Sequence, residues 1–171
     1  MDADTLRDMQ APLKAQYRDD PAAGIVTLRA AGTLDSEDLV CSVETGRALV
    51  EAGLHPATGG DGMAACSGDM LLQALVACAG VTARAVATAI GVELRGGTIR
   101  AEGEVDFRGT LGVSKETPVG FTGIRLHFDF DTDADAEQLA ALMKLTERYC
   151  VIYQTLCAAP PVTVSHEITP G

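Results

Sequence analysis

Five cysteines are the residues of this 171-residue chain most able to do chemistry, because a thiolate can act as a nucleophile. They are Cys41, Cys66, Cys78, Cys150 and Cys157. An odd number of cysteines without Cys-x-x-Cys spacing disfavours both a disulfide framework and a structural zinc site. The pattern therefore indicates free thiols in a reducing compartment.

Cys78 lies near the middle of an apolar stretch, Asp69 to Ile90, which predicts a long buried helix. Leu75 precedes Cys78 by three residues, so the thiol is near the apolar side of that helix. A cysteine in such a place is commonly a small inert hydrophobe. By itself, the spacing leaves both a reactive and a purely structural role open.

The same stretch of 22 residues is long enough to cross a bilayer at about 1.5 Å per residue. Gln73 and Arg84 lie inside it, and an arginine within a membrane span costs several kcal/mol on insertion scales. No second long hydrophobic segment is present. We therefore expect a core helix and no membrane partner.

Other candidate sites are weaker. The loop His55 to Met63 contains three glycines and a proline, but no Gly-Lys-Ser/Thr follows, as a phosphate-binding loop would require. His55, His127 and His166 lack metal-ligand spacing. We expect no metal and no cofactor.

The elements that must position the cysteines alternate between strand and helix patterns, which predicts an α+β fold in one domain covering residues 1–171. The segments 24–30 and 39–45 are expected to pair as a hairpin, and 47–52 is either a short strand or a helical turn. Period-two alternation is clearest in 121–131. The remaining expectations are an N-terminal arm or short helix at 1–16, a turn at 17–21, helix caps at Ser67 and Asp69, a strand after a Gly96–Gly97 turn, helices from Asp133 to Cys150 and from Cys150 to Cys157, and a closing strand at 162–168.

The composition limits the partners. The formal net charge of −11 argues against nucleic acid, because phosphates would be repelled at long range. With 47% hydrophobic residues, the chain can bury a single core. The N-terminus carries acids where a signal peptide would carry positive charge, so a cytoplasmic location is expected.

The residues from Gly59 to Cys78 resemble the central motif of the OsmC/Ohr family, the osmotically inducible and organic-hydroperoxide-resistance proteins. That motif is a glycine-rich loop, an acidic residue, then Leu-Leu and small residues up to a cysteine. Glu147-Arg-Tyr-Cys150 stands where the family has its second cysteine, 72 residues after Cys78. The Pro and Ser of the family's Cys-Pro-x-Ser are absent here. The resemblance covers roughly residues 24–168.

The resemblance implies a fold of antiparallel sheets packed around a long central helix, in an intertwined homodimer. It also implies a thiol peroxidase that acts on small-molecule organic hydroperoxides. Cys78 would become a sulfenic acid, Cys150 would resolve it as a disulfide, and an external dithiol would reduce that disulfide. The alternative is a non-catalytic relative that binds a small molecule or senses oxidation.

Family members activate the first thiol with an arginine that is held by a carboxylate. Arg18 is the candidate cation and Asp69 its candidate holder, with Arg47 as the alternative cation; a capping role for Asp69 stays open. Cys157 is seven residues after Cys150, about 10 Å along one helix, too far for a mutual disulfide. Cys66 is either an additional redox-active thiol or a small residue without a chemical role.

Overall fold

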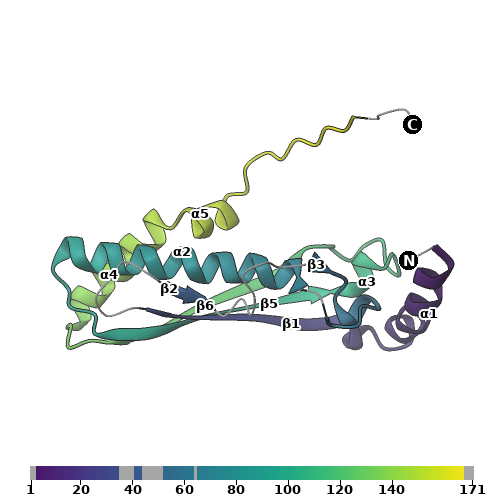
Figure 1. Cartoon of the computed structure of the whole chain (residues 1–171), viewed down its shortest axis with the longest axis horizontal. Helices are drawn as coiled ribbons and strands as arrows, with labels where there is room; N and C mark the ends of the chain where they lie inside the picture. The colour runs from purple at the N-terminus through teal and green to yellow at the C-terminus, as the bar shows by residue number, and fades with distance from the viewer. Residues whose placement is uncertain (1–2, 35–40, 44–51, 64, 168–171) are drawn as a thin grey trace.

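A computed structural model of the chain describes residues 3–34, 41–43, 52–63 and 65–167. It confirms the predicted α+β class: antiparallel strands form a sheet, and the longest helix lies along one face of it (Figure 1). The helices are α1 (Ala3–Asp19), α2 (Ser67–Ile90), α3 (Phe107–Thr110), α4 (Ala136–Tyr149) and α5 (Val151–Cys157), with short 3₁₀ helices η1 (Pro21–Gly24) and η2 (Pro56–Thr58). The strands are β1 (Ile25–Leu34), β2 (Cys41–Val43), β3 (Ala52–Gly53), β4 (Ala65–Cys66), β5 (Gly96–Asp106) and β6 (Phe121–Asp131).

The main sheet has the strand order β2-β1-β5-β6, with every neighbouring pair antiparallel. The predicted hairpin is confirmed only in part: β1 and β2 are antiparallel neighbours, but Gly32–Leu34 pair with β2, whereas the predicted segment 24–30 pairs with β5. On β5, Ile99 and Ala101 alternate with more exposed residues and are fully buried in the core beside α2. β3 and β4 form a separate parallel pair at the start of α2.

β6 has the bounds and the alternation that its sequence predicts. Ile124, Leu126, Phe128 and Phe130 are half-buried against the core, and the residues between them are exposed. One face of the strand therefore packs on the core, and the other face is exposed to solvent. β6 is the last strand of the sheet, so one of its edges faces no described strand.

Gly96 and Gly97 are strand residues and not the predicted turn. Gly97 pairs with Phe130, and a Cβ on Gly97 would come within 2.4 Å of the Asp129 carbonyl oxygen. The glycine therefore serves a close approach between two backbones, a role that the sequence pattern does not distinguish from a turn.

α1 continues to Asp19, so the turn predicted at 17–21 begins only at Asp20, three residues later. Tyr17 is 3% exposed, and its hydroxyl donates a hydrogen bond of 2.7 Å to the carbonyl oxygen of Ala57. Burying this side chain keeps the last turn of the helix in place. The chain then turns at Asp20, whose carboxylate accepts from the Ala22 amide.

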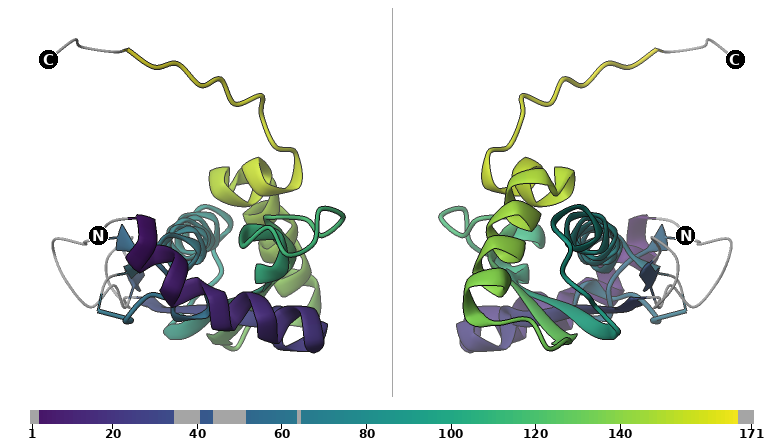
Figure 2. Two further views of the ribbon diagram at one scale, coloured as in Figure 1. Left: turned by 90° about the vertical axis from the view of Figure 1, so that its right-hand side faces the viewer. Right: turned by 90° about the vertical axis from the view of Figure 1, so that its left-hand side faces the viewer.

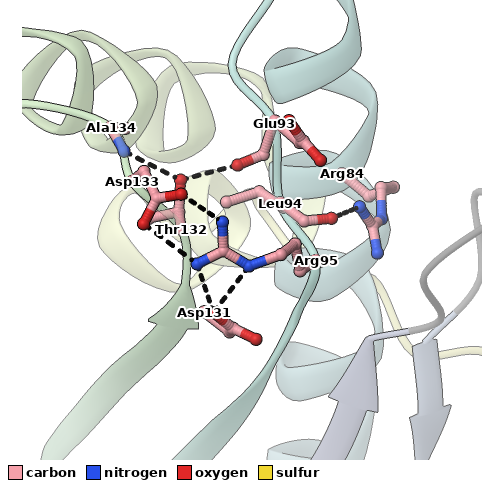
Figure 3. A network of polar contacts seen from close by, with 8 residues as sticks. All are labelled: Arg84, Glu93, Leu94, Arg95, Asp131, Thr132, Asp133 and Ala134. Carbon is pink, nitrogen blue, oxygen red and sulfur yellow. Dashed lines mark hydrogen bonds and ion pairs between the residues drawn. The ribbon is translucent and has the colours of Figure 1, made fainter.

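α2 begins at Ser67, so Cys66 occupies the cap position and provides no side-chain hydrogen bond there; the predicted cap at Ser67 is wrong. By length and composition α2 could cross a membrane, but half of its apolar window is buried within this chain, as in the core helix of a soluble protein. Arg84, one of the two polar residues noted within this apolar stretch, is 7% exposed and donates to the Leu94 carbonyl oxygen (Figure 3).

A polar network joins the chain after α2 to the chain before α4 (Figure 3). The guanidinium of Arg95 contacts Asp131 at 2.7 Å and Asp133 at 2.5 Å. The Thr132 hydroxyl donates to the Glu93 carbonyl oxygen at 2.6 Å. These contacts are largely exposed and add little stability singly, but together they set where α4 starts relative to α2. Asp135 caps α4 in a capping box with Gln138, as its acidic start predicts.

The predicted closing strand at 162–168 is not formed within the described residues. After α5, residues 159–167 run as an extended, exposed segment away from the sheet (Figure 1). A strand needs a neighbour for its backbone hydrogen bonds, and no described strand of this chain lies beside it. The alternatives left open for 47–52 fall almost wholly on residues outside those that the structure describes.

Candidate functional site

Cys78 lies on α2, between the helix face that is buried in the core and the face that α5 contacts. Leu75 and Ala79 on either side are almost fully buried, whereas Cys78 itself is half-buried. α5 lies over the middle of α2, and the two helices are in contact (Figure 1). The amides of Val151 and Ile152, at the start of α5, hydrogen-bond to the Cys78 sulfur.

The junction of α4 and α5 positions Cys150, which is 1% exposed. Its amide donates to the Thr146 carbonyl oxygen at 2.9 Å and so ends α4. Its sulfur accepts a hydrogen bond of 3.5 Å from the Tyr153 amide and so caps α5. One non-helical residue thus forms a corner between two helices, and both helices contact α2.

The corner brings Cys150 into hydrogen-bonding contact with Cys78. Burial raises the pKa of Cys78, but hydrogen bonds from the Ile152 amide, the Cys150 thiol and the Thr82 hydroxyl outweigh that effect, with a further one from the Val151 amide. The net pKa of Cys78 lies below its ordinary value. Donors that favour the charged form of an acid lower its pKa, so this site favours the thiolate.

Cys150 shifts in the opposite direction. Its pKa is raised to about 11, mainly by burial. The hydrogen bond to Cys78 and the repulsion from the Cys78 sulfur raise this pKa further, whereas hydrogen bonds from the Tyr153 and Ile152 amides lower it. At neutral pH Cys150 therefore keeps its proton and offers it to Cys78. The two thiols therefore differ in how readily each loses its proton, because charge on one sulfur disfavours charge on the other.

Replacing Thr82 by valine is expected to raise the pKa of Cys78, because the isosteric side chain no longer donates to the thiolate. Alkylation of Cys78 by iodoacetamide, followed by peptide mass, should move to higher pH and slow several-fold at pH 7. Thr82→Ser keeps the hydroxyl and should retain the original profile. Identical profiles for both variants would mean that Thr82 does not activate the thiol.

A cavity of about 460 Å³ lies between α2, α4, α5 and β6, and neither Cys78 nor Cys150 is among the residues that line it. Leu75, one turn before Cys78, lines it together with Tyr153 and Leu156 of α5. Phe121 and Phe128 of β6 form the opposite wall. Its lining is mainly apolar, with Glu147 and Cys157 as polar groups at the side of the helices.

Arg18 and Asp69, the two other predicted site residues that the structure describes, do not lie at Cys78 in this chain. Arg18 is exposed near the end of α1, which lies at the end of the molecule far from α5 (Figure 1). Asp69 lies in the first turn of α2, nine residues before Cys78 and so about 14 Å away along the helix. Arg47 is outside the described residues. The roles of Arg18 and Asp69 stay predictions.

The groups that sequence reasoning missed are the donors around the sulfur. Thr82 could have been found from its position four residues after Cys78, which places it one turn away on the same helix. The amides of Val151 and Ile152 could not be predicted from residue types, because every residue except proline has a backbone amide. Cys66 is half-buried and Cys157 exposed, and neither is bonded in a disulfide.

Comparison with known proteins gives three findings. Residues 59–165, which include Cys78 and Cys150, match the family model of OsmC-like proteins. The crystal structure of an OsmC-like hydroperoxide resistance protein from Jannaschia sp. CCS1 is similar, with a TM-score of 0.57 and 16% identity over 86% of this chain and 95% of that chain. At this identity the likeness concerns the fold. No curated protein sequence matches the chain.

Proposed function

Because this chain belongs to the OsmC-like protein family, we propose that it is a thiol-dependent peroxidase that reduces organic hydroperoxides. The observation that carries the proposal is the contact between Cys78 and Cys150, whose pKa values shift in opposite directions. A nucleophile with a lowered pKa beside a protonated thiol is the arrangement that a two-cysteine peroxidase needs. The similar Jannaschia protein is itself described as a hydroperoxide resistance protein.

In the first step, the Cys78 thiolate attacks the outer peroxide oxygen. The O–O bond breaks, Cys78 becomes a sulfenic acid, and the alkoxide leaves as an alcohol after taking a proton. The sulfur is oxidised by two electrons and the hydroperoxide is reduced by two. Cys150 then attacks the sulfenic sulfur, water leaves, and a Cys78–Cys150 disulfide forms. An external dithiol returns both cysteines to thiols and becomes a disulfide itself.

The change at Cys78 also prepares Cys150 for the second step. Burial is the largest cause of its high pKa, but the hydrogen bond to Cys78 and the charge repulsion from Cys78 also contribute. Both of these disappear when the thiolate becomes a neutral sulfenic acid. The Tyr153 and Ile152 amides, which lower the pKa of Cys150, remain. Cys150 therefore becomes easier to ionise only after the peroxide has reacted.

The apolar cavity between α2, α5 and β6 supports an organic substrate over hydrogen peroxide. Its apolar walls, among them Leu75, Phe121 and Leu156, can bury a hydrocarbon group at about 25 cal/mol per Å². Hydrogen peroxide has no such group to bury. The hydroperoxide end would then lie toward Cys78, one turn along α2 from Leu75.

The proposal includes a cytoplasmic location and a homodimer. Arg18 assists the first thiolate with Asp69 as its holder, and because α1 lies at the far end of this copy, Arg18 would have to come from the second copy. The amides and hydroxyl around Cys78 already lower its pKa without a cation among the described residues. The arginine would therefore add to the thiolate's stability and bind the polar peroxide group.

A second candidate function rests on the residues after Cys150. Val151, Ile152 and Tyr153 stand in place of the family's Pro-x-Ser, which favours a relative that binds a small molecule or senses oxidation without turnover. In that case Cys78 would react slowly or not at all.

One experiment separates the two. Reduced protein is mixed with an equimolar organic hydroperoxide, its thiols are counted over time, and disulfides are mapped by peptide mass. We expect a Cys78–Cys150 link within seconds, slower with hydrogen peroxide and slower again in Arg18→Ala. Survival of both thiols in excess hydroperoxide would reject the peroxidase, and an unchanged rate in Arg18→Ala would remove that residue from the site.

A further inference from the structure

The cavity between α2, α4, α5 and β6 has apolar walls and one carboxylate. Glu147 is the only Asp, Glu, Lys, Arg or His among the described residues that line it. The volume of about 460 Å³ lies within the range of small-molecule sites, about 300–1,000 Å³. A ligand that fills this cavity therefore meets apolar side chains and a single charged group.

The corner between α4 and α5 places Glu147 at the cavity. Glu147 lies in the last turn of α4, three residues before Cys150. Its backbone carbonyl oxygen accepts a hydrogen bond of 2.7 Å from the side-chain amide of Gln154 in α5. Both helices contact α2 and lie on the same side of it in the two views along α2 (Figure 2). The corner that brings the two thiols together therefore also holds Glu147.

No described residue forms an ion pair with the Glu147 carboxylate. The ion pairs within the described part of the chain all join other residues. Two basic residues are close to Glu147 in sequence, but neither Lys144 nor Arg148 lines the cavity. The guanidinium carbon of Arg148 instead lies over the Tyr149 ring, 5.7 Å from its centre. The charge that this chain presents to the cavity is therefore negative.

The charge of Glu147 already acts on another residue of the cavity wall. The pKa of the Tyr153 phenol is raised, first by its hydrogen bond with Cys157 and then by repulsion from Glu147. A phenol that keeps its proton is an uncharged hydrogen-bonding group. Because a nearby charge disfavours a second charge of the same sign, Glu147 opposes a negative group in the cavity, whether that group belongs to Tyr153 or to a ligand.

We propose that Glu147 makes this cavity select against carboxylates, so that the substrates are uncharged alkyl hydroperoxides and not hydroperoxides of carboxylic acids. A carboxylate entering the cavity would lose part of its hydration and meet a like charge, with no cation among the described lining residues to offset either cost. An uncharged chain of the same length buries the same apolar surface without that cost. The substrate class rests on the peroxidase proposed above, whereas the selection by charge can be measured without peroxide.

The first test measures binding of three unreactive probes, octanol, octanoate and octylammonium, to reduced full-length protein by NMR titration in low salt. Octanol should shift the amide signals of cavity residues such as Gly123 and Leu156. In Glu147→Gln, octanoate should bind about 5-fold more tightly and octylammonium about 5-fold more weakly, with octanol unchanged. Both changes should shrink in about 0.3 M salt, because salt screens an exposed charge.

The matched control is Glu137→Gln. Glu137 is exposed in the first turn of α4, ten residues before Glu147 and so about 15 Å away along the helix. The variant removes the same charge and should leave all three affinities unchanged. The inference would be overturned by an octanoate affinity that is the same in Glu147→Gln as in the unmodified protein, by signal shifts away from the cavity, or by no binding of any probe.

Turnover then connects the cavity to the substrate. With a dithiol present, kcat/KM should be higher for octyl hydroperoxide than for the ω-hydroperoxide of octanoate. Glu147→Gln should reduce that ratio about 5-fold, and Glu137→Gln should preserve it. An unchanged ratio in Glu147→Gln would overturn the substrate class while leaving the peroxidase in place. No turnover of either compound would instead reject the peroxidase, and the substrate class with it, whatever the probe titrations show about charge.

Discussion

Replacing Cys78 by serine is expected to lower the rate of hydroperoxide consumption by about 10³-fold or more. A serine hydroxyl does not ionise near neutral pH, so the amides of Ile152 and Val151 and the Thr82 hydroxyl would surround a neutral group. The oxygen of serine also cannot be oxidised by a peroxide in place of sulfur. Consumption of an organic hydroperoxide in the presence of a dithiol measures the effect.

The matched control for this variant is Cys66→Ser. Cys66 is also a half-buried free thiol, but it lies twelve residues earlier, where α2 begins. It should retain the rate of the unmodified protein. A Cys78→Ser protein that still consumes hydroperoxide at a comparable rate would move the nucleophile to another cysteine and contradict the assigned site.

Replacing Cys150 by serine is expected to separate the two chemical steps. Serine keeps a hydroxyl that can donate to the Cys78 thiolate, so the first oxidation should proceed and consume one equivalent of hydroperoxide per chain. The disulfide cannot form, and turnover with a dithiol should fall about 100-fold because the sulfenic acid is no longer converted to a disulfide. Dimedone should label Cys78, and peptide mass detects the adduct.

Cys150→Ala gives the matched comparison, because it removes both the resolving sulfur and the donor. The pKa of Cys78 should rise in this variant, since the thiol of Cys150 is one of the groups that lower it. Its oxidation at pH 7 should therefore be slower than in Cys150→Ser. A disulfide that still forms at Cys78 in either variant would show that a different cysteine resolves the sulfenic acid.

Local patterns predicted most elements of the fold well. The alternation in 121–131 is that of β6, because one face of this strand packs on the core and the other meets water. The acidic start of α4 appears as a capping box at Asp135. Gly96–Gly97 misled the prediction because a glycine that admits a neighbouring backbone looks the same in sequence as a glycine in a turn.

The candidate site was predictable only in part. Cys78 and Cys150 came from the resemblance to a family, since an apolar helix by itself favours an inert cysteine. The resemblance also implied that an arginine activates the first thiol. In the described residues, backbone amides and the Thr82 hydroxyl do this instead, and they depend on the corner at Cys150 rather than on any charged side chain.

The sequence by itself determined the apolar helix with Cys78 at its middle, the second thiol at the start of a late helix, and the strand-like segment at 162–168. Only the tertiary structure decided that two residues 72 positions apart touch, that they differ in pKa, and that none of the described strands lies beside the last segment. The physical reason is that a thiol's pKa and a strand's stability both depend on donors and acceptors from distant parts of the chain, which local periodicity does not record.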